Sequence, residues 1–381
     1  MQTKPARRIG SDSTATPRRS RLLRWAAPAL AGLVSMGALG CGGLEVKRIN
    51  SAEKKPNNVW VFFTVKDGEE PVGGLSADDF EIYEDGKIVS KFESKQVIQN
   101  PEVAAVMYTM LLVDMSGSIT ESDQIDPLVD AAKRFATKVG KTQKVGVYAF
   151  DGSDKLEKIV GFTESEGSVE SGLEKLRKYK SKDPSTNLHG AVIKGLDELE
   201  KELEKDSRPL KFGTLVTFTD GADRAGRYTQ DQMNEAMGQE KYANYEKLSI
   251  GVGADIEEGD LSAVGPNGSE RATDQKKLGE AFDKIADRID RHMKRFYLLS
   301  YCTPARAGEH QVTIKAKDPK TESTGSLDYT FKADGFGPPP DCNPETKPSF
   351  DLKASVKEDG KSDGGGSPGS VKVQGSGSVG K

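Results

Sequence analysis

Oxygen-bearing side chains gather in three polar segments, two of which follow apolar runs of the sequence. Asp114, Ser116 and Ser118 come directly after an apolar run that ends at Val113, in the pattern D-x-S-x-S. Thr186 and Asp220 stand in two further polar segments, 183–187 and 219–221. Carboxylate and hydroxyl oxygens without thiol or imidazole are the ligands that Mg²⁺, Mn²⁺ and Ca²⁺ prefer. The sequence therefore predicts a site for a hard divalent cation.

The D-x-S-x-S spacing suits such a site because alternate side chains can converge where the chain turns sharply after a strand. Gly117 permits that turn. Neutral hydroxyl ligands leave the cation with residual positive charge, and Mg²⁺ usually keeps exchangeable waters. An acidic side chain of a partner could replace one of those waters.

Alternating strand and helix patterns between residues 104 and 295 would position these segments. Such alternation predicts an α/β fold, a doubly wound and mostly parallel sheet with helices on both faces, whose ligands bind at the carboxyl ends of the strands. Apolar runs predict strands at 107–113, 144–150, 158–162, 213–218 and 247–252. Apolar periodicity predicts helices at 121–139, 168–178, 188–204, 229–241 and 276–294.

With these elements, residues 104–295 resemble the von Willebrand factor A domain family and its metal-ion-dependent adhesion site. All five positions of the family motif match, namely Asp114, Ser116, Ser118, Thr186 and Asp220. The resemblance implies a Rossmann-like fold, a bound Mg²⁺ (or Mn²⁺ or Ca²⁺), and a protein ligand that supplies a carboxylate, without enzymatic activity. The sequence departs from the family at Pro184-Ser185, where glycine is common. The resemblance therefore does not predict the conformation of that loop.

Other interpretations of the same residues remain. Single Asp and Ser residues often cap helices, but capping does not explain three such loops together. The chain could be a scaffold or assembly subunit with a structural metal, or a metal-dependent hydrolase. His189 fits a helix-surface histidine better than a general base, and Asp123 and Asp223 fit solvated loop carboxylates better than ligands of a second cation.

Two β-rich segments, 59–103 and 296–345, flank the α/β region. Strands are expected at 59–65, 80–84 and 87–92, with the tight-turn pair Asp85-Gly86 between the last two. Three more are expected at 296–301, 309–316 and 327–332. We predict that both segments form one small antiparallel β domain into which the α/β domain is inserted. Parts of both resemble bacterial secreted proteins related to von Willebrand factor A.

The amino terminus has the pattern of a targeting segment. Basic residues up to Arg24 precede an uncharged stretch, and 1–40 is interpreted as a signal peptide. Residues 38–41 resemble a bacterial lipobox, so Cys41 is the expected lipidation site, and 41–58 the expected tether. Gly42 favours the outer membrane or cell surface over the inner membrane. In an oxidising envelope the other two cysteines, Cys302 and Cys342, are expected to form a disulfide.

Composition limits the remaining classes. The chain has 381 residues, which is room for two or three domains. Its net charge is -4, and seven of its basic residues lie in 1–40, so the body is more acidic still. Such a body lacks the basic surface that nucleic acids require. The Gly/Ser-rich end, 346–381, is expected to be disordered because it has few large apolar residues.

Overall fold

The computed structural model describes residues 43–253, 257–338 and 341–350, which belong to one compact unit, Gly42–Lys381. The predicted signal peptide 1–40, Cys41 and the tail from residue 351 onward lie outside the described residues. No helix in the described ranges combines the length and hydrophobicity needed to cross a bilayer.

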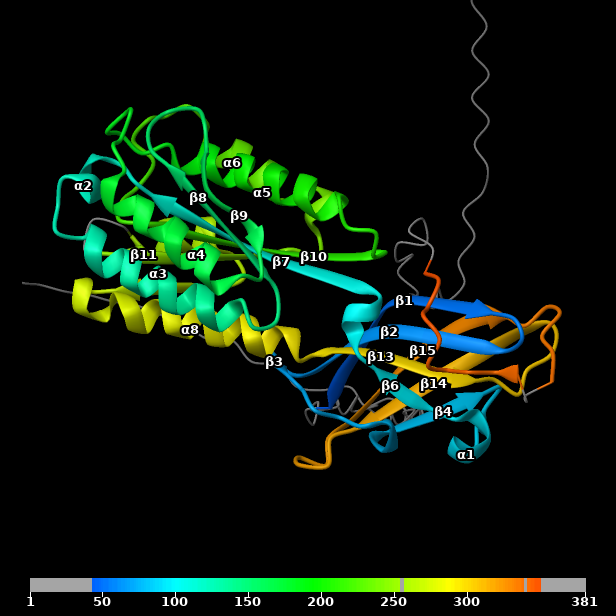
Figure 1. Cartoon of the computed structure of the whole chain (residues 1–381). Helices are drawn as coiled ribbons and strands as arrows, with labels where there is room; N and C mark the ends of the chain where they lie inside the picture. The colour runs from blue at the N-terminus through cyan, green and yellow to red at the C-terminus, as the bar shows by residue number, and fades with distance from the viewer. Residues whose placement is uncertain (1–42, 254–256, 339–340, 351–381) are drawn as a thin grey trace, which may run out of the picture. The chain divides into compact units, whose positions relative to one another are not determined.

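A six-stranded sheet forms the centre of the α/β part (Figure 1). Its strand order is β12-β11-β10-β7-β8-β9, and every neighbouring pair is parallel except β8 and β9. The predicted mostly parallel sheet is therefore confirmed. Its strands are β7 (Ala105–Asp114), β8 (Lys144–Phe150), β9 (Glu157–Thr163), β10 (Leu210–Thr219), β11 (Glu246–Val252) and β12 (Ser269–Ala272).

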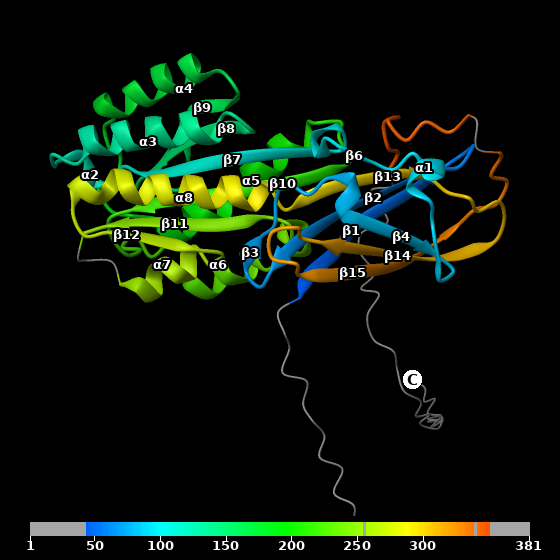
Figure 2. The same cartoon turned by 90° about the horizontal axis from the view of Figure 1, so that it is seen from below.

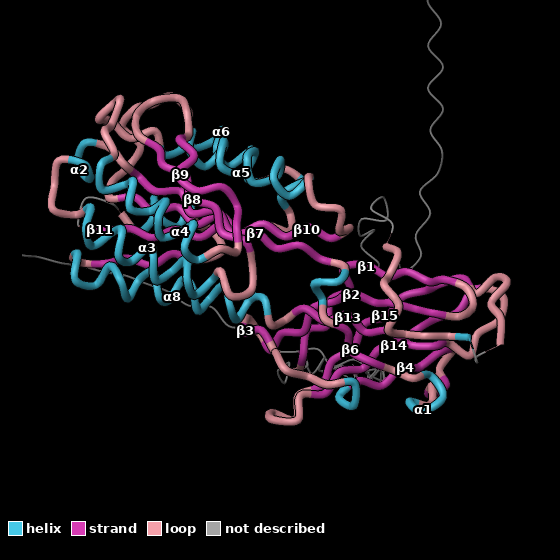
Figure 3. Tube along the Cα trace, viewed as in Figure 1, coloured by secondary structure: helices cyan, strands magenta, loops and turns pink. Residues whose placement is uncertain are grey.

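Helices cover both faces of this sheet, which explains why β7 is buried along its whole length (Figure 3). Leu111 and Val113 pack on the face covered by α3, α4 and α8, whereas Met110 and Leu112 pack on the face covered by α5 and α6. A strand covered on both sides needs a continuous apolar sequence. The helices are α2 (Gly117–Thr120), α3 (Ile125–Val139), α4 (Glu166–Leu173), α5 (Leu188–Glu204), α6 (Gln230–Met237), α7 (Glu258–Val264) and α8 (Leu278–Met293).

The β part consists of two antiparallel sheets that share one apolar core (Figure 2). One has the order β1-β2-β13-β6, with β3 paired to β2, and the other has the order β15-β14-β4-β5. The strands are β1 (Leu44–Lys54), β2 (Asn58–Asp67), β3 (Glu70–Pro71), β4 (Phe80–Glu84), β5 (Lys87–Ile88), β6 (Val97–Gln99), β13 (Phe296–Cys302), β14 (Glu309–Lys317) and β15 (Thr324–Lys332).

Strands from the two flanking segments pair with each other across the α/β insertion. Phe63 of β2 lies opposite Tyr297 of β13, and β4 pairs with β14 in the same antiparallel manner. The turn between β4 and β5 has positive φ at both Asp85 (49°) and Gly86 (75°), as a type I′ hairpin requires. The predicted hairpin turn is confirmed, and strands of the two flanking segments pair with each other.

The expected tether 41–58 is wrong for most of its length. Leu44–Lys54 forms strand β1, which pairs with β2 and has a register shift between Arg48 and Asn50. Leu44 and Val46 are buried while Glu45 and Lys47 are exposed. Because only one face of this strand is covered, its sequence alternates and looks polar overall.

Other elements also differ from what the sequence predicts. The expected strand 87–92 ends at Ile88, and the helical turn α1 (Lys91–Ser94) follows it. The helix expected at 121–139 begins at Ile125, and α7 and β12 were not predicted. The expected disordered tail 346–381 begins too early, since the ring of Phe350 is buried 6.4 Å from that of Phe62.

The predicted disulfide between Cys302 and Cys342 is present and closes a loop with a sequence separation of 40. On the chain-entropy model, a loop of this size stabilises the fold by roughly 3–4 kcal/mol. We expect the Cys302→Ala/Cys342→Ala double variant to lose about that much free energy of unfolding in urea. Added reductant should lower the stability of the natural protein to the same level and leave the variant unchanged; equal stabilities without reductant would contradict the prediction.

Candidate metal centre

The first and third predicted segments meet at the carboxyl edge of the sheet, where β7 ends at Asp114 and β10 ends at Thr219. The Ser116 amide donates to Oδ1 of Asp114 at 3.0 Å. The Ser116 and Ser118 hydroxyls lie 3.2 Å apart, and the Ser118 hydroxyl donates to Oδ1 of Asp220 at 3.0 Å. A hydrogen-bonded chain of oxygens thus joins loops 102 residues apart in sequence.

The loop that carries Thr186 contacts both of the others. The Gly117 amide donates to the Pro184 carbonyl at 2.9 Å, and the Arg224 amide donates to the Thr186 carbonyl at 2.9 Å. A Cβ at position 117 would lie 2.9 Å from the Pro184 Cβ, so only glycine allows this approach. Pro184 therefore determines how the loop packs, and the three loops that carry the five predicted residues contact one another.

Burial differs sharply across this site. The Asp114 and Ser116 side chains are fully buried and Thr186 is nearly so, whereas Ser118 is exposed and Asp220 partly exposed. The Thr219 hydroxyl donates to Oδ2 of Asp114 at 2.7 Å. Burial, followed by the negative charge of Asp220, raises the pKa of Asp114 to about 7. We call the buried residues Asp114, Ser116 and Thr186 the floor of the site, and the more exposed Ser118 and Asp220 its rim. Each of the two contains one carboxylate.

The residues present fit a divalent cation bound mainly by oxygen. The Asp114 and Asp220 carboxylates and the Ser116 and Ser118 hydroxyls are joined by hydrogen bonds, and the loop of Thr186 packs against their loops. Within the described ranges, no three or more His, Cys, Asp or Glu side chains gather as a metal site. No described lysine, arginine or histidine forms an ion pair with Asp114, so a bound cation would supply the missing positive charge. Oxygen donors of mixed charge suit Mg²⁺, Mn²⁺ or Ca²⁺.

Two residues beside the site have roles that differ from the sequence interpretation. The Asp223 side chain is only 5 % exposed, and it accepts hydrogen bonds from the amides of His189 at 3.0 Å and Gly226 at 2.8 Å. It thereby satisfies a free amide in the first turn of α5 and holds the loop that follows Asp220. His189 itself donates through Nδ1 to the Tyr228 carbonyl at 3.0 Å, which gives it a structural role. In the sequence, the signal that indicates this turn is the D-x-x-G spacing of residues 223–226.

We expect Asp223→Ala to weaken both the fold and the cation site. Loss of the helix cap should cost about 1–2 kcal/mol of unfolding free energy, and a looser loop should reduce cation affinity roughly tenfold, as for other supporting residues. Urea unfolding and calorimetric titration would measure the two effects. Asp123→Asn is the matched control because Asp123 is exposed; equal behaviour of the two variants would contradict the role given to Asp223.

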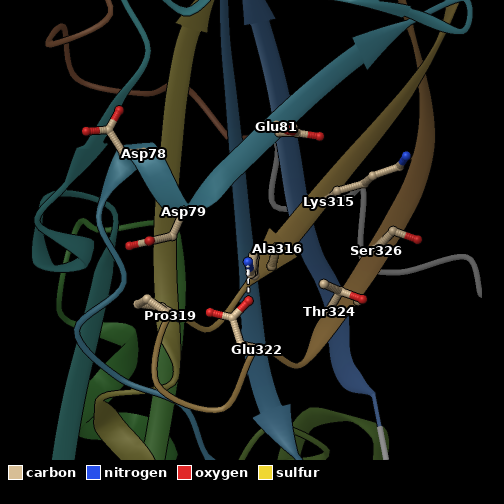
Figure 4. A pocket seen from close by; sticks show the side chains of 11 residues that line it. Asp78, Asp79, Glu81, Lys315, Ala316, Pro319, Glu322, Thr324 and Ser326 are labelled. Carbon is tan, nitrogen blue, oxygen red and sulfur yellow. Dashed lines mark ion pairs between the residues drawn. The ribbon is translucent and has the colours of Figure 1, made fainter. Parts of the chain in front are cut away.

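A hollow of about 670 Å³ in the β part contains none of the site residues. It lies along β4, β14 and β15, and Figure 4 shows carboxylates and lysines around its mouth. Glu322 pairs with Lys317, and the Asp79 carboxylate accepts from the Ser76 amide at 2.7 Å. The carboxylates of Glu322 and Asp79 therefore already have partners within the protein. The carboxyl edge of the α/β sheet remains the candidate site.

Comparisons with known proteins agree with this geometry at the level of the domain. A family model described as the von Willebrand factor type A domain matches residues 109–222. A comparison with curated protein sequences gives no match. The matched residues include Asp114, Ser116, Ser118, Thr186 and Asp220.

Several solved structures are similar to this chain. One is proximal thread matrix protein 1 from the mussel byssus with a zinc-occupied MIDAS motif, at 16 % identity and a TM-score of 0.41, with 48 % of each chain covered. The chain thus spans about half the length of that protein. Another is a von Willebrand factor type A protein from Catenulispora acidiphila, at 12 % identity and a TM-score of 0.41, covering 77 % of this chain and 74 % of that one. The manganese-loaded TRAP protein of Plasmodium vivax matches at 15 % identity and a TM-score of 0.38, covering 68 % and 100 %.

Proposed function

Because the chain contains a von Willebrand factor type A domain, we propose that it binds an acidic protein ligand through a divalent cation held at the carboxyl edge of that domain. The hydrogen-bonded chain from buried Asp114, through the Ser116 amide and the Ser116 and Ser118 hydroxyls, to the more exposed Asp220 supports this proposal most directly. Buried ligands hold the cation, while the exposed rim leaves one side of it open to a partner.

Each residue has a distinct part in this proposal. Asp114 and Asp220 supply the negative charge that attracts the cation, and Ser116, Ser118 and Thr186 supply neutral oxygens. When bound, the cation supplies the positive charge that attracts a carboxylate. The buried floor excludes water from one side, which strengthens electrostatic attraction at the site.

The ligand side of the proposal can be tested with peptides. The unit 42–381 would be passed over immobilised peptides that contain aspartate or glutamate, and over matched peptides with asparagine or glutamine. We expect retention only on the carboxylate peptides, only with Mg²⁺ or Mn²⁺, and not with chelator. Thr186→Val, which removes one hydroxyl and keeps the side-chain shape, should weaken retention; equal retention on amide peptides would overturn the proposal.

We also propose that the protein is a lipoprotein of the cell envelope, anchored through Cys41 and displayed at the outer membrane or cell surface. The lipobox-like segment 38–41 and the disulfide between Cys302 and Cys342 support this location, since disulfides persist in oxidising compartments. Metabolic labelling with a fatty acid should mark the natural protein but not Cys41→Ser. Labelling of both, or of neither, would contradict the anchor.

A further inference from the structure

Basic side chains form a stripe along one face of α8 and just beyond its end. Lys284, Arg288, Arg291 and Arg295 are spaced by three or four residues, which places them on the same side of a helix. Three of them have acidic neighbours: Lys284 with Glu270 at 3.0 Å, Arg291 with Glu70 at 3.9 Å, and Arg295 with Glu246 at 3.8 Å. The Arg288 side chain forms no ion pair or hydrogen bond with another described residue.

Two adjoining hollows, of about 260 and 270 Å³, share Arg288 and Arg291 in their walls. The first lies where the α/β and β parts meet, because Lys66 of β2 lines it together with residues of α8 and β11. Its complete lining is Lys66, Glu69, Glu70, Pro71, Glu246, Pro266, Asn267, Arg288, Arg291, His292 and Arg295.

The polar groups at the back of this hollow leave one donor without an acceptor. Nη2 of Arg295 donates to Nε2 of His292 at 2.7 Å, so Nδ1 of His292 carries its proton toward Glu246 Oε1, 3.2 Å away. Nε of Arg295 is buried and has no hydrogen-bond partner. A buried donor without an acceptor is costly, so this guanidinium lies beside the hollow with part of its hydrogen-bonding capacity unused.

Four basic side chains line the hollow against three carboxylates, those of Glu69, Glu70 and Glu246, so the lining keeps one excess positive charge. Burial, followed by the positive charge of Arg295, lowers the pKa of His292 to about 3, and Lys66 and Arg288 act in the same direction. His292 is therefore neutral near pH 7, chiefly because it is buried and secondly because Arg295, Lys66 and Arg288 are nearby. The C-terminal dipole of α8 accounts for basic residues in its last turn, but it does not account for Lys66, which comes from the other part of the unit.

We propose that the hollow between β2 and α8 binds an oxyanion of the phosphate class, held by Arg288, Arg291, Lys66 and the guanidinium of Arg295. Guanidinium groups match the geometry of phosphate oxygens, and several of them around one hollow form such a site. A bound phosphate would join the β part to the α/β part. The phosphate could be a free ion or the headgroup of a phospholipid.

Thermal unfolding of the unit 42–381 with inorganic phosphate tests this proposal, with chloride used to hold ionic strength constant. At a phosphate concentration tenfold above Kd, the unfolding midpoint should rise by roughly 2–4 °C. Arg288→Gln should lose this rise, whereas Arg134→Gln, an exposed arginine on α3, should keep it. Because Arg288 is exposed, its replacement should leave the fold intact.

Flotation with phosphatidylglycerol-containing vesicles distinguishes the two sources of phosphate. Vesicle binding that depends on Arg288, without a response to inorganic phosphate, would support the pocket and assign it to a lipid headgroup. A response to inorganic phosphate alone would assign it to the free ion. If Arg288→Gln behaves like the natural protein in both measurements, or if neither probe binds, the proposal is overturned; neither result depends on the cation site.

Discussion

Replacing Asp114 with asparagine is expected to abolish cation binding while leaving the metal-free fold as stable as before, or more stable. Asp114 is fully buried, and the negative charge of Asp220 acts on it. Without a cation, that buried charge costs free energy. Asparagine has nearly the same shape, and its oxygen can still accept the hydrogen bond that Thr219 donates at 2.7 Å, although the bond from the Ser116 amide is lost.

Calorimetric titration of Mg²⁺ and Mn²⁺ into the unit 42–381 measures the first effect, and we expect an affinity loss of at least about 100-fold, beyond that for supporting residues. Thermal unfolding with chelator measures the second. Asp123→Asn serves as the control because it removes an exposed carboxylate. Unchanged cation affinity in Asp114→Asn would disprove the site, and a large loss of stability with chelator would show that Asp114 mainly supports the fold.

Phe62→Ala is expected to cause the largest loss of stability among single substitutions proposed in this protein. Phe62 of β2 is fully buried. Its ring centre lies 5.9 Å from that of Phe212 on β10 and 5.8 Å from that of Phe296 on β13. It therefore packs the β part against the α/β sheet, and its truncation should cost about 3–5 kcal/mol.

Urea unfolding followed by two probes would measure this loss and test the junction. Phe92→Ala provides a control of the same residue type, since Phe92 is 93 % exposed and should change stability by less than about 0.5 kcal/mol. We expect the natural unit to unfold in one transition because the two parts share this aromatic cluster. A small effect of Phe62→Ala would show that the parts unfold independently.

Periodicity predicted the α/β elements well where the pattern was strong. The helix at 188–204 and the strand at 144–150 have the predicted bounds because their apolar residues face well-defined layers. The short elements α7 and β12 escaped prediction, since seven and four residues carry too little periodicity. Strand β1 escaped for another reason, as its alternation was outweighed by its charged residues.

For the candidate cation site, the sequence alone predicted which residues offer oxygen, because D-x-S-x-S, Thr186 and Asp220 each follow or precede a recognisable element. Residue type and local spacing are encoded in short stretches of chain. The tertiary structure decided the rest: that Asp114 is buried while Ser118 is exposed, that Pro184 lies against Gly117, and that Asp223 caps α5. The same holds for the hollow lined by Lys66 and Arg288, since burial and long-range contacts depend on how distant segments pack.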